Sequence, residues 1–268
     1  MSVDVIEREA EAIATEEYIV GEPFDYSVEH SDTYYEQFMS SFEPNTKKRR
    51  FYRFMKRFFD IVSSFIGLVL LSPILLIIAI AIKLESRGPI IFKQQRMGKD
   101  GKLFNCYKFR SMRIDAPRNC PTAELENPNS YLTRVGRILR KTSLDELPQL
   151  WCVFIGTMSV IGYRPLVSNG VDAECNEMRE RLGVLSMRPG ISGYAQVLGR
   201  DAVYFKNKAI LDALYVKDAS LWFDIKLLFM TIAVVFNRKG NKDNAHKQST
   251  TPAVESESIE SSQDEIVV

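Results

Sequence analysis

The sequence predicts an α+β fold that is associated with a membrane and contains a re-entrant N-terminal helical hairpin, a small β-hairpin and interfacial amphipathic helices. Three observations predict this fold class. No residue from Ile61 to Ile82 is charged, the segment after this run alternates apolar and polar residues around a Gly-Lys-Asp-Gly turn, and apolar residues recur at helical spacing from Asn127 onward.

Charge divides the chain of 268 residues into three parts, although the net charge is only +1. Residues 1–46 hold 12 acidic residues and one basic residue, and residues 241–268 hold six acidic and two basic residues. The part between them, 47–240, keeps 32 basic and 16 acidic residues. We therefore expect a central domain that meets an anionic partner (nucleic acid, a phosphorylated substrate or a membrane surface) between two acidic tails that are mostly disordered or weakly docked. The composition, 46% hydrophobic and 26% charged, excludes collagenous, disulfide-dense and wholly disordered chains.

The uncharged run predicts a membrane helix over residues 58–83. At 1.5 Å per residue the run alone makes a helix of about 33 Å, and a bilayer core is about 30 Å thick. A buried helix of a soluble protein is the weaker alternative at this length. The first 50 residues contain no apolar run of the kind found in a secretory signal peptide.

Both flanks of this helix are basic, with seven Lys and Arg residues over 47–57 and six over 83–102. The positive-inside rule then favours a cytoplasmic position for both ends. Pro73 cannot donate a backbone hydrogen bond and crowds the preceding turn, so we expect a kink there, with the Ser72 hydroxyl bonded to a freed carbonyl. The pattern favours a re-entrant hairpin broken at Ser72 and Pro73; a kinked single span is the alternative.

Residues 88–112 are typical of a β-hairpin or short strand pair. Beyond it, a basic amphipathic helix that lies on an anionic leaflet is predicted, because Arg and Lys alternate with apolar residues at helical spacing. These apolar residues are Leu132, Val135, Ile138 and Leu139. A further helix is predicted over 220–236, either as a core helix or as an interfacial one.

The cysteine and histidine residues give no metal-ligand spacing. They are Cys106, Cys120, Cys152, Cys175, His30 and His246. Because the cysteines are scattered and both histidines fall in the predicted tails, we expect reduced cytosolic thiols and no zinc site.

Two adjacent carboxylates, Asp145 and Glu146, follow the basic helix. Such a pair can serve as a nucleophile toward phosphorus with an orienting partner, or can hold a divalent metal ion together with phosphates. Taken alone, an Asp-Glu pair near a helix start is more typical of an N-terminal cap.

Several basic residues occur in strands and turns near this pair in sequence. Each of them alone is typical of a solvated surface charge. The guanidinium group of arginine can donate two hydrogen bonds to one phosphate, so several such residues together predict an anion site. The candidates are Lys108 and Arg110 on one face of a predicted strand, Arg164 with Pro165 in a turn, Arg188 in a loop with two glycines, and Arg200.

The motifs in this order resemble those of the bacterial sugar transferase family, which are monotopic polyprenyl-phosphate phosphoglycosyl transferases. The segments are KRFFD, an apolar stretch with Ser-Pro, FKQQRMGKDGKLFNCYKFRSM, LRKTSLDELPQLW, MSVIGYRPL, RPGISGYAQVLGR and LYVKDASLWFDIKLL. The resemblance covers residues 56–238 without a missing block, and the chain is similar to the short members that consist of the catalytic domain alone.

The resemblance implies an enzyme that transfers a sugar-1-phosphate from a UDP-sugar to polyprenyl (undecaprenyl) phosphate and releases UMP, the initiating step of surface glycan biosynthesis. In such an enzyme Asp145 would be the nucleophile that forms a covalent phosphosugar intermediate, assisted by Glu146, with Mg²⁺ at these two carboxylates. The residues implied for phosphate binding are Lys108, Arg110, Arg140 and Arg164, and those for the nucleotide end are Arg188 and Arg200.

The resemblance also implies the inner membrane as the location, with the catalytic domain on the cytoplasmic face, and downstream glycosyltransferases as further partners. A catalytically silent membrane scaffold of a glycan-assembly complex is the alternative, which the intact carboxylate pair disfavours. A nucleic-acid binder would also suit the basic centre, but the apolar run argues against it.

Overall fold

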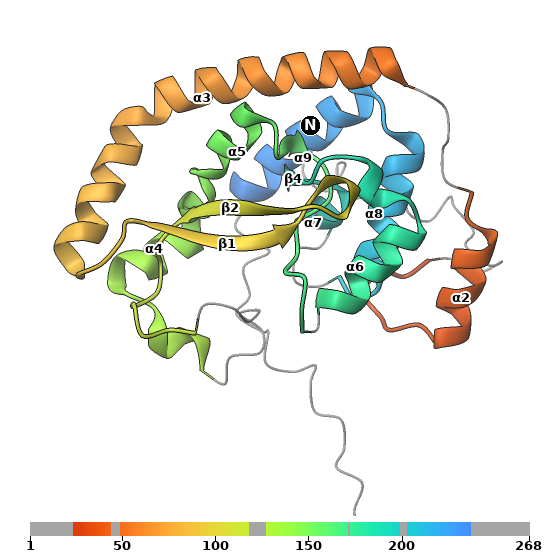
Figure 1. Ribbon diagram of the computed structural model, residues 1–268, viewed down its shortest axis with the longest axis horizontal. Helices are drawn as coiled ribbons and strands as arrows, with labels where there is room; N and C mark the ends of the chain where they lie inside the picture. The colour runs from red at the N-terminus through yellow and green to blue at the C-terminus, as the bar shows by residue number, and fades with distance from the viewer. Residues whose placement is uncertain (1–23, 44–48, 118–126, 171, 199–202, 237–268) are drawn as a thin grey trace, which may run out of the picture.

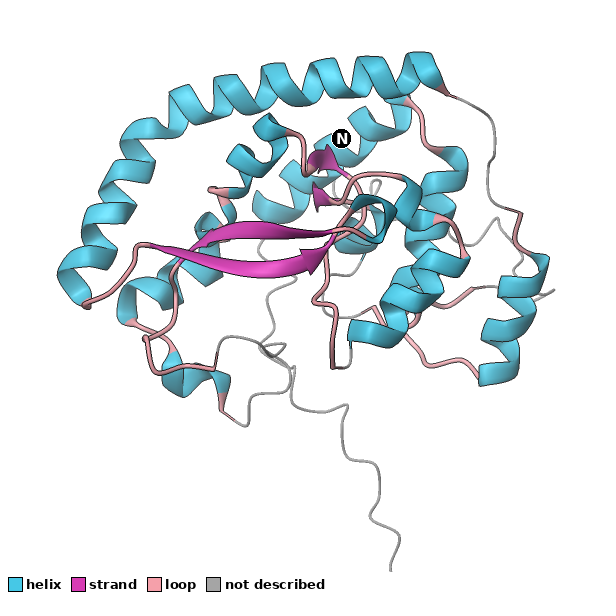
Figure 2. Cartoon of the chain, viewed as in Figure 1, coloured by secondary structure: helices cyan, strands magenta, loops and turns pink. Residues whose placement is uncertain are grey.

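The computed structural model of the chain describes residues 24–43, 49–117, 127–170, 172–198 and 203–236, and it combines helices with two small sheets (Figures 1 and 2). The helices are α2 (Asp32–Ser41), α3 (Arg50–Glu85), α4 (Arg134–Thr142), α5 (Gln149–Ile155), α6 (Asp172–Arg181), α7 (Tyr194–Leu198), α8 (Asn207–Asp218) and α9 (Leu221–Phe236). The strands are β1 (Ile91–Met97), β2 (Leu103–Phe109), β3 (Ser159–Ile161) and β4 (Gly190–Ser192).

Helix α3 is the predicted apolar element, and it runs further in both directions than residues 58–83. Within the described residues it is the one helix long and apolar enough to cross a bilayer, and most of its apolar side chains are exposed. The helix arches over the molecule and bends in its second half (Figure 1). Pro73 lies inside it, and the Ser72 hydroxyl donates to the carbonyl of Val69, the one that Pro73 leaves without a partner, at 2.7 Å.

The predicted break at Ser72 and Pro73 is therefore a bend within one continuous helix, and no loop separates two arms. The physical reason is that proline removes a single helical hydrogen bond, which the Ser72 hydroxyl partly replaces at Val69.

The N-terminal end of α3 is fixed to the C-terminal half of the chain. Arg49 donates to the carbonyls of Lys217, at 2.7 Å, and of Ala219. Lys56 forms an ion pair of 2.9 Å with Asp224 of α9, and both side chains are nearly buried. One face of the apolar helix is thus held on the folded domain while the other stays exposed.

The C-terminal end of α3 is fixed to α4 and β2. Glu85, its last residue, accepts hydrogen bonds from the backbone N–H groups of Arg134, at 2.6 Å, and Val135, at 3.1 Å, and so caps the start of α4. Arg110 closes this end by donating to the backbone carbonyls of Ser86 and Arg87, each at 2.8 Å. Both ends of the helix therefore contact the same folded unit.

The predicted β-hairpin is present: β1 and β2 pair antiparallel from Ile91 opposite Phe109 to Met97 opposite Leu103. Its connection is a short 3₁₀ turn, Lys99–Gly101, in which Asp100 has φ of 56° and Gly101 has φ of 70°. The Gly-Lys-Asp-Gly sequence suits this left-handed geometry, because glycine and aspartate tolerate positive φ.

The remaining predicted helices are found with shifted boundaries. The basic amphipathic helix is α4, which starts after the N-cap Thr133 and buries Leu139 while Ile138 stays 62% exposed. The 220–236 segment is α9, for which the sequence left core and interfacial roles open. The helix has one buried face and one exposed face: Leu227 and Met230 are buried in the core, whereas Trp222 is 76% exposed.

The main core lies among α6, α7, α8 and α9, and α2 packs against it. Residues 24–43 belong to the segment 1–46 that the sequence predicts to be a mostly disordered or weakly docked tail, but in the structure they pack firmly into the core. Phe24, Tyr35 and Phe38 are almost wholly buried in this core, and Tyr35 donates to the buried Asn207 at 2.9 Å. The segment is acidic overall, but its few aromatic side chains bury enough apolar area to hold it on the core.

Candidate active site

The carboxylate pair lies in a sharp turn between α4 and α5. Ser143 ends α4 in the left-handed conformation, with φ of 58°, and turns the chain into the 3₁₀ turn Leu144–Glu146. Helix α5 then begins after Pro148, with no side-chain cap. The capping alternative therefore does not hold for this helix; the turn packs against β2, and the Glu146 carboxylate reaches Lys108 on that strand.

Glu146 is held by two cations from distant elements. Its Oε1 accepts from Nζ of Lys108, on β2, at 2.8 Å and from Nη2 of Arg164 at 2.8 Å. Nη1 of Arg164 also donates to Oε2 at 3.4 Å, so both terminal nitrogens of the guanidinium contact the carboxylate. Burial raises the pKa of Glu146, but the charges of Arg164 and Lys108 outweigh burial and hold the pKa well below its usual value. Glu146 is thus a fixed anion that orients two cations.

Asp145 has a different environment although it is the next residue. It is 9% exposed, and no hydrogen bond or ion pair to it is found among the described residues. Burial raises its pKa, Lys108 and Arg140 lower it, and the neighbouring Glu146 charge raises it; the net direction is upward. Arg140, anchored by a 3.0 Å hydrogen bond to the Ser111 hydroxyl, supplies a third cation near the pair. A carboxylate left free beside fixed cations can act on an anionic phosphorus centre.

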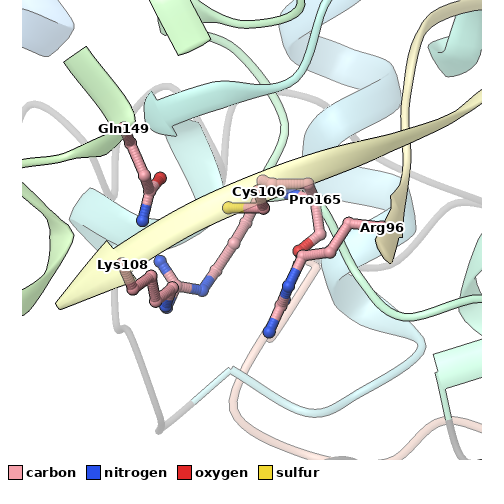
Figure 3. Close-up of a pocket in the computed structure, with 6 residues that line it drawn as sticks. Arg96, Cys106, Lys108, Gln149 and Pro165 are labelled. Carbon is pink, nitrogen blue, oxygen red and sulfur yellow. The ribbon is translucent and has the colours of Figure 1, made fainter. Parts of the chain in front are cut away.

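A shallow surface hollow lies beside the two cations that hold Glu146, and Lys108, Arg164 and Pro165 line it (Figure 3). Arg96, Cys106 and Gln149 complete its lining, and these three were not among the sequence candidates. Figure 3 shows the Gln149 amide and the Lys108 side chain directed into the same space beside β2.

Strand periodicity could have found two of the missed residues. In the hairpin register Gln94 faces Cys106 and Arg96 faces Phe104, so Arg96 and Cys106 lie on the same sheet face as Lys108. Applying the alternation to both strands, rather than to β2 alone, would have assigned them. Gln149 is the first residue of α5, and no local pattern distinguishes it from a surface glutamine.

Two other candidates, Arg110 and Arg188, do not join this cluster. Arg110 closes the end of α3, and Arg188 donates to the Gly156 carbonyl at the end of α5, at 2.8 Å. Arg57 donates to the Val153 carbonyl of the same helix end at 2.6 Å. Helix C-termini leave carbonyls without partners, and an arginine fork suits these as well as it suits phosphate. Arg200 lies outside the described residues.

The glycines of the Arg188 loop have a packing role. A Cβ on Gly190 would come within 2.1 Å of the Gly162 nitrogen, and one on Gly193 within 1.9 Å of the Gly162 carbonyl oxygen. These glycines let β3 and β4 approach closely, so close packing accounts for both glycines of the motif.

The donor set fits a magnesium ion only when phosphate is also present. Among the described residues, no group of three or more His, Cys, Asp or Glu side chains comes together. Mg²⁺ is commonly held by one or two carboxylates together with substrate phosphates and water. Asp145 offers free oxygens for this purpose, whereas those of Glu146 already accept from Lys108 and Arg164.

Comparison with known proteins gives a consistent result. The model of the family described as bacterial sugar transferase matches residues 51–238. The chain is 40% identical over 210 residues to an undecaprenyl-phosphate galactose phosphotransferase of Salmonella typhimurium, which covers 73% of this chain and 43% of that protein.

Two further relatives act on other sugars by name. A UDP-glucose:undecaprenyl-phosphate glucose-1-phosphate transferase of Escherichia coli is 40% identical, over 70% of this chain and 41% of its own length. A UDP-N-acetylgalactosamine-undecaprenyl-phosphate N-acetylgalactosaminephosphotransferase of Aeromonas hydrophila is 39% identical, over 70% of this chain and 45% of its own. The chain thus spans less than half the length of these relatives.

Proposed function

The chain belongs to the bacterial sugar transferase family, and from this we propose that it transfers a sugar-1-phosphate from a UDP-sugar to undecaprenyl phosphate, releasing UMP. This reaction would initiate the assembly of a surface glycan, such as a capsule, an exopolysaccharide, an O-antigen or a glycoprotein glycan. The names of the relatives support the substrates, and their sugars differ from one another.

One observation carries the proposal: a buried carboxylate, Asp145, lies free beside a carboxylate, Glu146, that fixes Lys108 and Arg164. A carboxylate that attacks a diphosphate faces like-charge repulsion, which preorganised cations reduce. The raised pKa of Asp145 also marks a more basic, and hence more nucleophilic, carboxylate than an exposed aspartate.

The chemistry then takes two displacements at one phosphorus atom. A carboxylate oxygen of Asp145 attacks the phosphorus that bears the sugar, and the bond from this phosphorus to the bridging oxygen breaks, so that UMP leaves with that oxygen. A phosphate oxygen of undecaprenyl phosphate next attacks the same phosphorus, the carboxylate–phosphorus bond breaks, and the sugar diphosphate lipid leaves. Asp145 is regenerated as a carboxylate, and no proton is consumed overall.

A magnesium ion fits this proposal through Asp145, with Glu146 beside it. When bound, the ion would neutralise charge on the diphosphate oxygens. Lys108, Arg140 and Arg164 provide positive charge from the protein itself.

We also propose that α3 is re-entrant, with both ends on the cytoplasmic side of the inner membrane. The contacts of Arg49 with Ala219 at one end and of Glu85 with Arg134 at the other support this topology. A helix that crossed the bilayer would separate its ends by about 30 Å of hydrocarbon, which is incompatible with both ends holding one folded unit. The central domain 47–240 would then lie on the side where the soluble UDP-sugar is available.

The decisive experiment offers the purified protein undecaprenyl phosphate with UDP-glucose, UDP-galactose or UDP-N-acetylgalactosamine and measures UMP. We expect UMP and labelled lipid with at least one sugar. Without the lipid, we expect about one equivalent of UMP and a protein mass increased by one sugar phosphate, both absent from Asp145→Asn. No turnover with any UDP-sugar would support a silent scaffold instead.

The topology is tested separately by placing single cysteines in the N-terminal and C-terminal segments of a cell-expressed protein that lacks its own cysteines. Re-entrance predicts that reagents unable to cross the membrane label neither position in intact cells and both after permeabilisation. Labelling of one of the two in intact cells would establish a full span.

A further inference from the structure

The segment Tyr163–Leu166, which carries Arg164 to the site, is fixed along its backbone by three different parts of the fold, β4, α6 and β1. Each of its four carbonyls accepts a hydrogen bond from outside the segment. The donors are, in order, the Gly190 N–H at 2.8 Å, the Arg179 side chain at 3.0 Å, the Arg96 side chain at 2.6 Å and the Met97 N–H at 2.9 Å. The donor to the Arg164 carbonyl itself is Arg179.

Arg179 reaches this carbonyl from α6 while bound to α8. Its Nε and Nη2 donate to Oδ2 of Asp212 at 3.0 and 2.6 Å, and its Nη1 donates to the Arg164 carbonyl. The side chains of Arg179 and Asp212 are each 1% exposed. The guanidinium also lies 5.3 Å from the centre of the Tyr163 ring. One buried fork thus joins α6 and α8 to the backbone of the segment that carries Arg164.

Stability alone does not explain a buried ion pair at this position. Removing two charges from water is costly, and well-packed apolar residues often replace such pairs without loss of stability. The pair here is also incompletely satisfied, since Oδ1 of Asp212 is buried and finds no partner among the described residues. What an apolar pair cannot supply is the third hydrogen bond, from Nη1 of Arg179 to the Arg164 carbonyl.

We propose that Arg179, held by Asp212, is a positioning residue that sets the backbone at Arg164, so that the Arg164 guanidinium meets Glu146 in the geometry needed for phosphoryl transfer. The inference rests on the proposed function for its catalytic consequence, and on the geometry alone for the link between Arg179 and Arg164. The Arg164 side chain is 42% exposed, so contacts with neighbouring side chains do not fix its position. The hydrogen bond from Arg179 to the Arg164 carbonyl fixes the backbone from which this side chain extends.

The test uses Arg179→Lys in the full chain. Lysine keeps the charge that pairs with Asp212, but its single ammonium lacks the fork that serves both acceptors. A purely structural role would therefore be rescued by lysine. We expect a fold retained by circular dichroism, a kcat lowered about 10- to 100-fold and a KM for the UDP-sugar changed by less than about threefold. The matched control is Arg181→Lys on the same helix, whose partner Glu36 is exposed.

A second measurement does not depend on activity. In the parent chain, Glu146→Gln and Arg164→Met should lower the thermal unfolding midpoint non-additively, because their side chains interact. In the Arg179→Lys background this non-additivity should fall by roughly half or more. The double variant Arg179→Met/Asp212→Leu, which removes the pair as a whole, should give the same loss if the lysine variant does not fold.

The outcomes separate the two proposals. If the parent chain transfers no sugar phosphate while the coupling falls in Arg179→Lys, the proposed function fails and the positioning role stands. If Arg179→Lys retains the parental kcat and the parental coupling, or the foldable double variant retains that coupling, Arg179 is structural only and the inference is overturned.

Discussion

Two neighbouring carboxylates show how environment divides chemical roles between residues of the same type. Arg164 and Lys108 hold Glu146 ionised, whereas burial shifts the pKa of Asp145 upward. Glu146 is thereby suited to fix cations and Asp145 to attack phosphorus, with no need for a histidine at the site.

The two carboxylates should have opposite effects on stability. The pKa of Asp145 is raised above 3.8 by folding, so its ionisation opposes folding at neutral pH, and Asp145→Asn should raise the unfolding midpoint. The pKa of Glu146 is lowered below 4.5, so its ionisation stabilises the fold above pH 4.5, and Glu146→Gln should cost about 1–3 kcal/mol at pH 7. Thermal unfolding in detergent from pH 4 to 8 measures both. The difference between parent and Glu146→Gln should shrink as pH falls below 4.5, and a lower midpoint for both variants at pH 7 would contradict the assignment.

The pH dependence of transfer should follow the ionisation of Asp145. The rate requires the carboxylate, so it should fall as pH decreases through the raised pKa. Lys108 is the strongest influence that lowers this pKa, so Lys108→Met should move the acid limb of the kcat profile to higher pH. Arg140→Met should move it in the same direction by less. Lys93→Met is the control, since Lys93 lies on the other face of the hairpin; an acid limb that stays in place in Lys108→Met would exclude Asp145 as the titrating group.

Part of the cluster could be predicted from the motif resemblance. Asp145 and Glu146 lie together with Lys108, Arg140 and Arg164, which the resemblance assigns jointly, and their roles in the reaction stay predictions. Arg110 and Arg188 instead bond to backbone carbonyls near helix ends. A sequence shows that an arginine is present but not which acceptor its fork meets, and that distinction depends on contacts between distant segments.

At the scale of elements, the position of Arg140 depends on how closely α4 approaches the segment after β2. A Cβ on Gly136 would lie 1.9 Å from the Ser111 carbonyl oxygen, so only glycine allows this approach. Gly136→Ala should push α4 outward, cost about 1–3 kcal/mol, and weaken the bond between Arg140 and the Ser111 hydroxyl. Unfolding midpoints and kcat measured together should both fall. Gly101→Ala is the control for a glycine with open space around it, although its positive φ adds a small cost of its own; parental values for Gly136→Ala would contradict the close packing.

The bend in α3 is the second element on which the architecture depends. A straight helix of 36 residues would span about 54 Å, and the contacts at its two ends could not then both form. Pro73→Ala restores a donor for the Val69 carbonyl and should straighten the helix. Spin labels at Phe51 and Leu84, both exposed, should move apart in that variant, with loss of the Glu85 cap on α4 and a lower kcat. Ser63→Ala, in the same helix, should leave the distance unchanged, and an unchanged distance in Pro73→Ala would show that Pro73 does not set the bend.

Local patterns predicted α3, the β-hairpin and α9, because each is specified by periodicity within its own segment. They did not predict how α2 and α6 pack, since those helices owe their burial to distant partners. The hydrogen bond from Tyr35 to Asn207 joins residues 172 positions apart. Composition alone made residues 24–43 look disordered, because it averages acidic residues with the few aromatic ones that bind the core.

At the scale of the whole molecule, two segments distant in sequence complete one core. Asn207 is wholly buried, and its amide donates to the backbone carbonyls of Tyr26 and Val28 while accepting from Tyr35. The Tyr204 N–H also donates to the Tyr26 carbonyl, at 3.0 Å. Residues 24–43, which lie before the family-matched part, thus hold the start of α8 in place.

This packing makes the N-terminal segment a determinant of stability for the entire domain. Phe38 is 4% exposed, and Phe38→Ala removes its ring from the shared core, so the free energy of unfolding should fall by about 3–5 kcal/mol. Gln37→Ala, an exposed neighbour on the same helix, should change it by less than about 0.5 kcal/mol. Hydrogen exchange should then show faster exchange at α8 as well as at α2 in the Phe38 variant, because Asn207 loses the segment that satisfies its amide. Faster exchange confined to α2 would mean that the segment folds as an independent unit and does not complete the core, and the unfolding midpoint of the rest of the chain would then stay at the parental value.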